Sequence, residues 1–353
     1  MGADIKTDGN IVKINSFTVK KRAYIDCNES GSTLRFLVSV AAALGISAAF
    51  NGKGKLPERP LDEFFRLYND SGIILKKETN KKRFLSMQGE CKSNEFILSG
   101  DVSSQYLSGL LMASPLYNRD INISLSTPLS SGSYVDITLD VMHDFGIDAI
   151  NRGSSYYIRG GQKYKPRDYK TEGDFSSAAF WYATKALGCD VEIQGLSPQT
   201  TKQGDRAIIE IVQKYSNANK NIVIDCDNIP DLIPIIAVIA ALSDGYKTIV
   251  KNCGRLRYKE SNRLAAIFEN LKTLNADIKI QGDDLIINGK SSLNGGEVEG
   301  YNDHRIVMSM AIAAIKCKDA VKINGFTAIN KSYPRFFEDY RKLGGKINVS
   351  NMG

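Results

Sequence analysis

The chain has 353 residues, 42% of them hydrophobic, which is enough for two domains with substantial cores. Its 46 Lys and Arg residues against 39 Asp and Glu give a net charge of +7, and the basic residues are scattered. This balance fits an anionic small substrate better than a nucleic acid, because no basic face interleaved with aromatic residues is present. A generally basic surface is the alternative interpretation.

The cysteines and the hydrophobic runs narrow the class of protein further. Six cysteines stand singly, with no CxxC pair and no Cys/His spacing typical of metal ligands. We therefore expect a reduced, cytoplasmic protein with no metal and no cofactor. No stretch reaches the roughly 18 uninterrupted apolar residues of a membrane span, and the opening residues do not form a signal peptide. We expect no membrane association.

The chain repeats a unit of two helices with flanking strands. The first helix of each unit is predicted to start at a small or acidic polar residue, at Ser32, Ser103, Ser176, Asp231 and Asp303. These starts are 71, 73, 55 and 72 residues apart (103−32, 176−103, 231−176, 303−231), so one unit is shorter than the others. The second helices are predicted to start near Arg59, Tyr134, Gly204, Ser261 and Tyr333. The pattern predicts an internally repeated α/β fold.

The repeat pattern and a polar run between two repeats predict where the domains begin and end. A polar run over residues 160–170 precedes a fresh helix, so we place one domain at residues 1–171 and a second at 172–353. The opening Met-Gly-Ala-Asp-Ile-Lys resembles the tails that follow the second helices. We therefore expect the sequence to start at the end of a unit whose helices are absent. The alternative is that Met1 is a true start and the likeness reflects a common turn.

Hydroxyl groups gather at the predicted helix starts of the first half. Gly31 lies between serines ahead of a helix, where backbone N–H groups can hold an oxyanion. Ser103, Ser104 and Gln105 offer two hydroxyls and an amide at a second helix start, and residues 130–134 (Ser-Ser-Gly-Ser-Tyr) do the same one element later. Such groups suit a phosphate monoester. Simple helix caps account for each cluster about as well.

Charged groups gather at the helix starts of the second half. Asp231 heads the apolar segment 232–242, and helix capping is its ordinary explanation. In residues 256–263, Lys259, Glu260 and Arg263 surround Ser261, which we expect to cap a helix. Other charges of this kind are Asp303, Arg305 and Lys331. If the units are arranged about an axis, these helix starts converge on a cleft for a multiply charged anion.

The motif in residues 256–263, Leu-Arg-Tyr-Lys-Glu-Ser-Asn-Arg, resembles the R-x-K-E-[ST]-[DN]-R signature of the 5-enolpyruvylshikimate-3-phosphate synthase family. Other motifs match that family in order and spacing: GSTLR at 31–35, ERP at 58–60, VSSQ at 102–105, EGD at 172–174, QGD at 203–205, IPD at 229–231, YNDHR at 301–305 and KSYP at 331–334. The resemblance spans essentially the whole chain.

The resemblance implies a fold and a reaction. The fold would be α/β, with two domains each built from βαβαββ-type repeats about a pseudo-threefold axis, the first repeat being incomplete here. The chain would be a transferase of the shikimate pathway, in aromatic amino-acid biosynthesis. In that reaction the 5-hydroxyl of shikimate 3-phosphate attacks C2 of phosphoenolpyruvate as C3 is protonated, and the tetrahedral adduct then loses phosphate. The resemblance further implies a monomer that binds only these small molecules.

The resemblance also implies roles for individual residues. Asp231 would be the base, Glu260 would carry a proton at the phosphoenolpyruvate methylene, and Lys259 would share the acid/base work. Shikimate 3-phosphate would be bound by Ser103, Ser104, Gln105, Ser131, Tyr134, Asp231 and Lys259. Phosphoenolpyruvate would be bound by Gly31, Arg59, Gln105, Arg263, Arg305 and Lys331. Bidentate binding of phosphate and carboxylate explains why three of these cations are arginines.

The main departure from the family is that its opening P-G-S-K-S-x-x-x-R motif is not among these residues. That motif supplies a Lys for both substrates and a Ser and an Arg for the shikimate phosphate. One alternative is therefore an inactive or split fragment that binds anions without turnover. Another is an enolpyruvyl transferase acting on a UDP-aminosugar, which the motifs at 259–261 and 302–305 disfavour because they belong to the shikimate branch.

Overall fold

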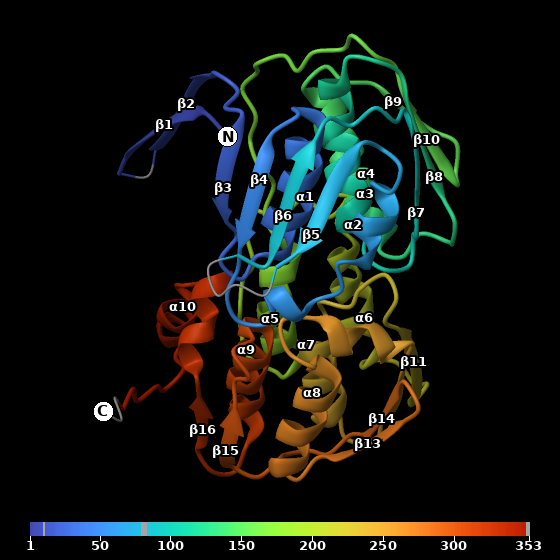
Figure 1. Cartoon of the computed structure of the whole chain (residues 1–353). Helices are drawn as coiled ribbons and strands as arrows, with labels where there is room; N and C mark the ends of the chain where they lie inside the picture. Colours follow the sequence, from blue (N-terminus) through green and yellow to red (C-terminus); the bar gives the residue numbers. More distant parts are fainter. Residues whose placement is uncertain (10, 79–82, 351–353) are drawn as a thin grey trace. The chain divides into compact units, whose positions relative to one another are not determined.

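The computed structural model describes residues 1–9, 11–78 and 83–350 (Figure 1). The chain divides into two compact units, unit 1 (Met1–Tyr169) and unit 2 (Lys170–Gly353), each with its own hydrophobic core. The break after Tyr169 lies close to the position after residue 171 that the sequence predicts.

Unit 1 alternates helices and strands and then closes each repeat with two antiparallel strands. Its strands are β1 (Ala3–Asp8), β2 (Ile11–Phe17), β3 (Arg22–Asp26), β4 (Ser47–Asn51), β5 (Ile73–Lys77), β6 (Leu85–Gly89), β7 (Glu95–Leu98), β8 (Ile121–Leu125), β9 (Ala149–Asn151) and β10 (Ser155–Ile158). Its helices are α1 (Gly31–Ala43), α2 (Asp62–Leu67), α3 (Ser104–Ala113) and α4 (Gly132–Asp144), with short 3₁₀ turns η1 (Leu56–Glu58) and η2 (Ser114–Tyr117).

The two four-stranded sheets of unit 1 share one topology. Their orders are β3-β4-β6-β5 and β7-β8-β10-β9. In each sheet the first two strands are parallel and the remaining pairs are antiparallel. A parallel pair needs a crossover, which α1 and α3 supply, whereas the antiparallel pair needs only a turn. Each sheet is therefore one βαβαββ repeat, as the sequence predicts.

Side-chain alternation and close helix packing build the core of unit 1. On β8, Ile121 and Ile123 are buried while Asn122 is not, so one face of the sheet covers the helices. Helix α3 approaches α1 closely at Gly109, where a Cβ atom would lie 2.6 Å from the backbone oxygen of Arg35. Only glycine permits this approach, which fixes the starts of α1 and α3 relative to one another.

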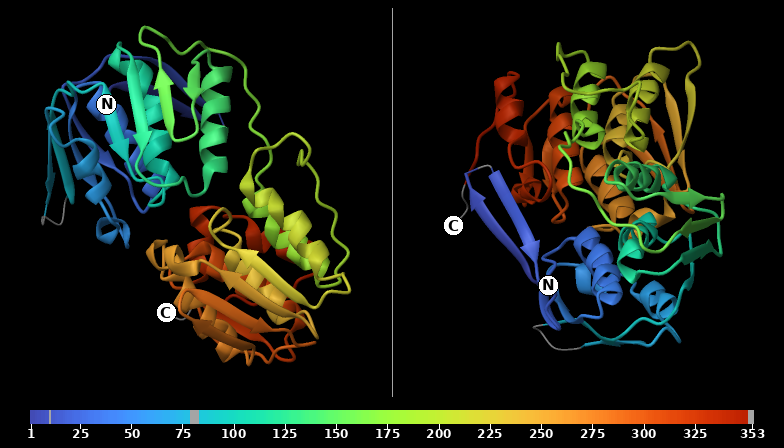
Figure 2. Two further views of the ribbon diagram at one scale, coloured as in Figure 1. Left: turned by 90° about the vertical axis from the view of Figure 1, so that its right-hand side faces the viewer. Right: turned by 90° about the horizontal axis from the view of Figure 1, so that it is seen from above.

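The β1–β2 hairpin differs from the rest of unit 1. Its two strands pair only with each other, and Figure 2 shows it standing apart from the four-stranded sheets of its unit. Residues 3–8 and 11–15 are exposed, including Ile5 and Ile14, which lie opposite one another. The hairpin has the form of the antiparallel pair that ends each complete repeat.

Unit 2 follows the same plan with modifications. Its helices are α5 (Phe175–Ala186), α6 (Ile208–Lys214), α7 (Ile233–Ala241), α8 (Arg263–Thr273), α9 (His304–Ala313) and α10 (Phe336–Lys342). Its strands are β11 (Asn221–Asp225), β12 (Lys247–Lys251), β13 (Asp277–Gln281), β14 (Asp284–Asn288), β15 (Gly296–Glu299) and β16 (Val321–Asn324). Short 3₁₀ turns are η3 (Gly204–Ala207), η4 (Cys253–Tyr258), η5 (Ala314–Lys316) and η6 (Phe326–Lys331).

The sheets of unit 2 explain the short repeat. The order β11-β12-β14-β13 reproduces the topology of unit 1, and β15 and β16 form a parallel pair. After α6, only residues 215–220 precede β11, and none of these described residues is in a strand. The 55-residue spacing therefore reflects a repeat without its closing strand pair. Helix α7 is buried on every side, which places it at the centre of this unit.

Phe336 ties α10 to α5 and provides a test of the unit 2 core. Its side chain is fully buried, stacks on Trp181 with ring centroids 5.3 Å apart, and meets Phe180 edge to face. We expect Phe336→Ala to lower the free energy of unfolding by about 3 to 5 kcal/mol, because a buried aromatic ring is replaced by a cavity. Urea unfolding followed by the fluorescence of Trp181, the single tryptophan, measures this. Leu343→Ala, at a half-exposed position, is the control, and an equal loss in both variants would contradict the packing.

Candidate active site in unit 2

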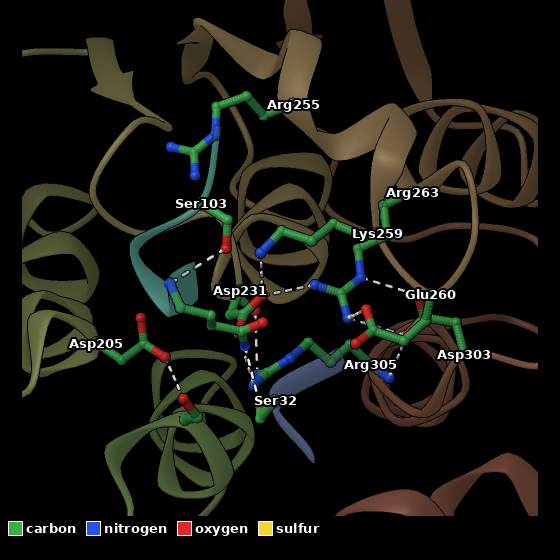
Figure 3. Close-up of polar contacts among 12 residues, drawn as sticks. Ser32, Ser103, Asp205, Asp231, Arg255, Lys259, Glu260, Arg263, Asp303 and Arg305 are labelled. Atoms are coloured by element: carbon green, nitrogen blue, oxygen red, sulfur yellow. Dashed lines mark hydrogen bonds and ion pairs between the residues drawn. The ribbon is translucent and has the colours of Figure 1, made fainter. Parts of the chain in front are cut away.

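Asp231 is the centre of a charged cluster in unit 2 (Figure 3). Its Oδ1 atom accepts from Arg263 Nη1 at 2.7 Å and from Lys259 Nζ at 3.3 Å, and its Oδ2 atom accepts from Arg305 Nη2 at 3.2 Å. Arg305 also donates to the backbone oxygen of Asp231. One carboxylate therefore holds three cations, contributed by the residue that ends η4 and by the first turns of α8 and α9.

Arg263 is the most buried of these cations. Its side chain is 1% exposed, and its nitrogens bind three carboxylates: Nη1 binds Asp231, Nη2 binds Glu260 at 2.6 Å, and Nε binds Asp303 at 2.8 Å. The guanidinium fork suits this role because it presents five donors in a fixed plane. Arg263 therefore sets the position of Glu260 as well as that of Asp231.

Asp303 holds this arrangement in place, although the sequence indicates only a helix start for it. Its side chain is completely buried. One oxygen accepts from the backbone N–H of Arg305 and caps α9, and the other accepts from Arg263 and from the hydroxyl of Ser261. Asp303 thus joins the starts of α8 and α9. Its pairing with Arg263 spans 40 residues of sequence, so no local pattern could have shown it.

The cap of α8 corrects one prediction. Ser261 does not cap this helix, because its hydroxyl donates to Asp303. Asn262 is the cap, and its side-chain oxygen accepts from the backbone N–H of Ala265 at 3.2 Å. Ser261 is instead a buried link between the two helix starts. Asp231 does not cap α7 either, because Leu232 occupies the cap position and the carboxylate binds the cations.

The cations keep the central carboxylates ionised. Burial alone would raise the pKa of Asp231, but Arg305, Lys259 and Arg263 outweigh burial and hold this pKa well below its ordinary value. Burial would likewise raise the pKa of Asp303, and the Arg263 charge lowers it instead. Burial and the charge of Arg305 lower the pKa of the neighbouring His304 to about 4. At neutral pH the cluster therefore contains ionised carboxylates and a neutral imidazole.

Two further cations of unit 2 lie at related positions. Lys331, in η6, donates to the backbone oxygen of Asn302, just ahead of α9. Arg255, in η4, binds the carboxylate of Asp227 at 3.1 Å. The structure thus places Lys331 near the start of α9, whereas Lys259, Glu260, Arg263 and Arg305 share direct contacts around Asp231.

Unit 1 contains a second polar group around Gly31. A Cβ atom at Gly31 would lie 2.5 Å from Arg35 Nη1 and 2.6 Å from Arg59 Nη1, so both guanidiniums reach the same backbone. Arg35 donates to the side-chain oxygen of Gln105, and the amide nitrogen of Gln105 donates to the hydroxyl of Ser32, each at 2.9 Å. Gly31, Arg59 and Gln105 were expected in one site from the sequence, whereas Arg35 was not assigned a role.

The hydroxyl clusters of unit 1 differ in their local roles. Ser103 caps α3 by accepting from the backbone N–H of Gln105, and Ser104 is buried in the first turn. Ser131 precedes α4 with a left-handed backbone (φ 57°), and its side chain does not cap that helix. Capping therefore explains Ser103 but not Ser131, whose left-handed backbone is an uncommon conformation for a residue other than glycine. Tyr134 lies in the first turn of α4.

Comparison with known proteins shows the family of the chain. The sequence profile described as EPSP synthase (3-phosphoshikimate 1-carboxyvinyltransferase) matches residues 1–340. The chain belongs to the EPSP synthase family. It is 41% identical to the 3-phosphoshikimate 1-carboxyvinyltransferase of Clostridium acetobutylicum, over 97% of this chain and 82% of that protein. It is also 41% identical to the protein of that name from Clostridioides difficile, over 93% of this chain and 78% of that protein.

Solved structures agree on the fold. An EPSP synthase from Acinetobacter baumannii superposes with a TM-score of 0.78 and 24% sequence identity, over 99% of this chain and 86% of that chain. This confirms the predicted α/β fold of the enolpyruvyl transferases. Within the described part of the chain, no helix could span a lipid bilayer, and no group of three or more His, Cys, Asp and Glu side chains could hold a metal ion.

Replacing Arg263 tests whether it holds the cluster together. In Arg263→Met, the buried carboxylate of Asp303 loses its counter-ion, so we expect the free energy of unfolding to fall by about 3 to 5 kcal/mol. Urea unfolding at pH 7, followed by Trp181 fluorescence, measures the loss. Arg257→Ala, which breaks only exposed contacts with Asp283 and with the backbone oxygen of Gly282, is the control and should cost less than about 0.5 kcal/mol. Similar losses in the two variants would refute a central role for Arg263.

Proposed function

We propose that this protein transfers the enolpyruvyl group of phosphoenolpyruvate to the 5-hydroxyl of shikimate 3-phosphate and releases inorganic phosphate. Family membership supplies the reaction, and the cluster around Asp231 supplies the groups that it needs. Addition requires a base for the hydroxyl and an acid for the methylene carbon, and both substrates require cations for their phosphate and carboxylate groups. The single observation that carries the proposal is that one carboxylate, Asp231, holds three cations.

The proton transfers are assigned to three neighbouring groups. Asp231 accepts the proton of the 5-hydroxyl while the oxygen of that hydroxyl forms a bond to C2 of phosphoenolpyruvate. Glu260 delivers a proton to C3 and takes one back when phosphate leaves, so the double bond forms again, and the proton held by Asp231 departs with the phosphate. Lys259, in contact with Asp231, stabilises the developing charge and shares the acid/base work. Arg263 fixes both carboxylates, so their separation does not depend on the substrate.

Phosphoenolpyruvate is assigned to the arginines and Lys331. Arg305 is 11% exposed and Lys259 is 26% exposed, so both can exchange a contact with Asp231 for one with an incoming anion. Arg263 and Lys331 bind the same substrate from unit 2. In unit 1, Arg59, Gln105 and the backbone of Gly31 form the corresponding group. Guanidinium groups suit phosphate and carboxylate because they bind both in a bidentate way.

Shikimate 3-phosphate is assigned mainly to the hydroxyls of unit 1. Ser103, Ser104 and Ser131 bind its phosphate at the starts of α3 and α4, where backbone N–H groups add further donors. Gln105 and Tyr134 contact the ring, and Asp231 and Lys259 reach its hydroxyls. The reaction needs no cofactor, and we propose a cytoplasmic monomer that binds no nucleic acid.

Phosphate release tests the reaction directly. The purified chain is mixed with shikimate 3-phosphate and phosphoenolpyruvate, and inorganic phosphate is measured against samples that lack either substrate. We expect release only when both are present. Binding of phosphoenolpyruvate without phosphate release would support the alternative of an anion-binding fragment. Release with a UDP-aminosugar in place of shikimate 3-phosphate would support the sibling transferase.

The acid and base assignments predict a specific kinetic pattern. Asp231→Asn and Glu260→Gln should each lower kcat by about 10²-fold or more, because general acid–base groups contribute about that much. Both KM values should change only a few-fold, because each variant keeps the size of its side chain. Asp283→Asn, an exposed carboxylate, is the matched control. Undiminished turnover in either variant would remove that residue from the catalytic roles.

Replacing Gly31 should weaken the binding of one substrate only. In Gly31→Ala the new Cβ would overlap a nitrogen of Arg35 and one of Arg59, so both must move away. We expect the KM for phosphoenolpyruvate to rise about tenfold, as for a weakened charge-assisted hydrogen bond, while the KM for shikimate 3-phosphate stays unchanged. Gly296→Ala, where the nearest atom is 3.5 Å from the new Cβ, is the control. A rise in both KM values would show that Gly31 acts on the fold instead.

A further inference from the structure

Asp205 is a buried carboxyl group that the proposed reaction does not use. It lies in η3, is 3% exposed, and accepts a hydrogen bond from the hydroxyl of Ser176 in the first turn of α5. Its other oxygen, Oδ1, is buried and has no hydrogen-bond partner among the described residues. A buried carboxyl oxygen of this kind is costly unless nearby charges interact with it.

The backbone around Asp205 is held in place by its neighbour Gln203. The side-chain oxygen of Gln203 accepts from the N–H of Phe175, and its amide nitrogen donates to the backbone oxygen of Gly173, each at 2.8 Å. These two bonds fasten η3 to the start of α5. Gln203 therefore fixes the backbone next to Asp205, and Ser176 fixes its carboxyl group.

Three charged groups act on Asp205 from the elements packed around it: Asp231 ahead of α7, Arg305 on α9 and Asp174 at the start of α5. Figure 3 draws Asp205 and its bond to Ser176 together with Asp231 and Arg305. Burial, followed by repulsion from Asp231, raises the pKa of Asp205 to about 6, against the opposing charge of Arg305. Above that pKa Asp205 is ionised, and its charge and that of Asp231 repel each other.

This position carries a cost in stability. Because the pKa of Asp205 is raised above its unfolded value near 3.8, stability falls as the pH rises from about 4 to about 6 and stays lower above that. An asparagine would keep the size of the side chain and could still accept from Ser176, without the cost. A buried, destabilising charge next to reactive groups is a mark of a functional position.

We propose that Asp205 is a positioning residue that strengthens Asp231 as a base, through repulsion between the two carboxylates and competition for the charge of Arg305. This inference rests on the proposed function. Three cations hold the proton affinity of Asp231 down, which stabilises its charge but weakens it as a base. The negative charge of Asp205 acts in the opposite direction. It becomes available as the pH rises through about 6.

The first test needs no substrate. Thermal unfolding is followed between pH 4.5 and pH 8 for the wild type, Asp205→Asn, Asp231→Asn and the double variant, with Asp283→Asn as the exposed control. We expect Asp205→Asn to raise the Tm increasingly as the pH rises through about 6. The gain should be smaller when Asp231 is already replaced, because the repulsion is gone. A gain that is independent of pH, or equal in both backgrounds, would overturn the proposal.

The second test measures turnover. We expect kcat of the wild type to rise near pH 6, and we expect Asp205→Asn to remove that rise, to lower kcat about tenfold and to change both KM values little. Asp205→Glu should restore part of that pH dependence. An active wild type whose Asp205→Asn variant keeps the same kcat and pH profile would overturn the proposal. A wild type without turnover would contradict the proposed function, and the comparison of Tm values then decides whether the two carboxylates repel.

Discussion

The buried ion pair between Arg263 and Asp303 is the interaction on which the unit 2 site depends. Both side chains are almost completely removed from water, so the charge of Asp303 depends on Arg263, whose own charge is balanced by Asp303, Asp231 and Glu260. Asp303 also caps α9, and Arg263 lies in the first turn of α8. One pair therefore fixes two helix starts. The contacts of Asp231 with Arg263 and Arg305 extend from these helix starts, whereas its contact with Lys259 comes from the end of η4.

The repeated architecture explains why the reactive groups lie where they do. Each βαβαββ repeat presents the start of a helix after its first parallel strand, and helix starts attract anions. Unit 1 uses this position for serines, and unit 2 uses it for Asp231 and Asp303. The same local geometry thus yields two kinds of polar site, one lined by hydroxyl groups and one that arranges ion pairs. The chemistry differs because the residues at equivalent positions differ.

Much of the fold could be predicted from the sequence, because helix caps and hydrophobic periodicity are local signals. The repeat spacing even indicated the shorter repeat between Ser176 and Asp231, which lacks a closing strand pair. The cap of α8 was wrong by one residue, because Ser261 and Asn262 are both good caps and only the buried partner Asp303 decides between them. Contacts of this kind are long-range, so propensity cannot show them.

The same distinction applies to the candidate site. The motifs indicated which residues gather, but not which pairs form: Arg263 with Asp303, or Arg35 with Gln105, join segments 40 and 70 residues apart. The cost of burying Asp205 was also hidden, since a Gln-Gly-Asp motif shows neither burial nor the neighbouring Asp231. The balance of charges inside a protein depends on how its side chains pack. The sequence shows which charged residues are present but not which of them form pairs.

A crystal structure of the protein with phosphoenolpyruvate and shikimate 3-phosphate bound would test the central claim most directly. We expect Lys259 and Arg305 each to bind a substrate oxygen, while the bond between Arg263 and Asp303 is kept and Asp231 reaches the hydroxyl of the shikimate ring. Substrates bound away from Asp231, or a cluster in which Arg263 leaves Asp303 to bind them, would contradict it.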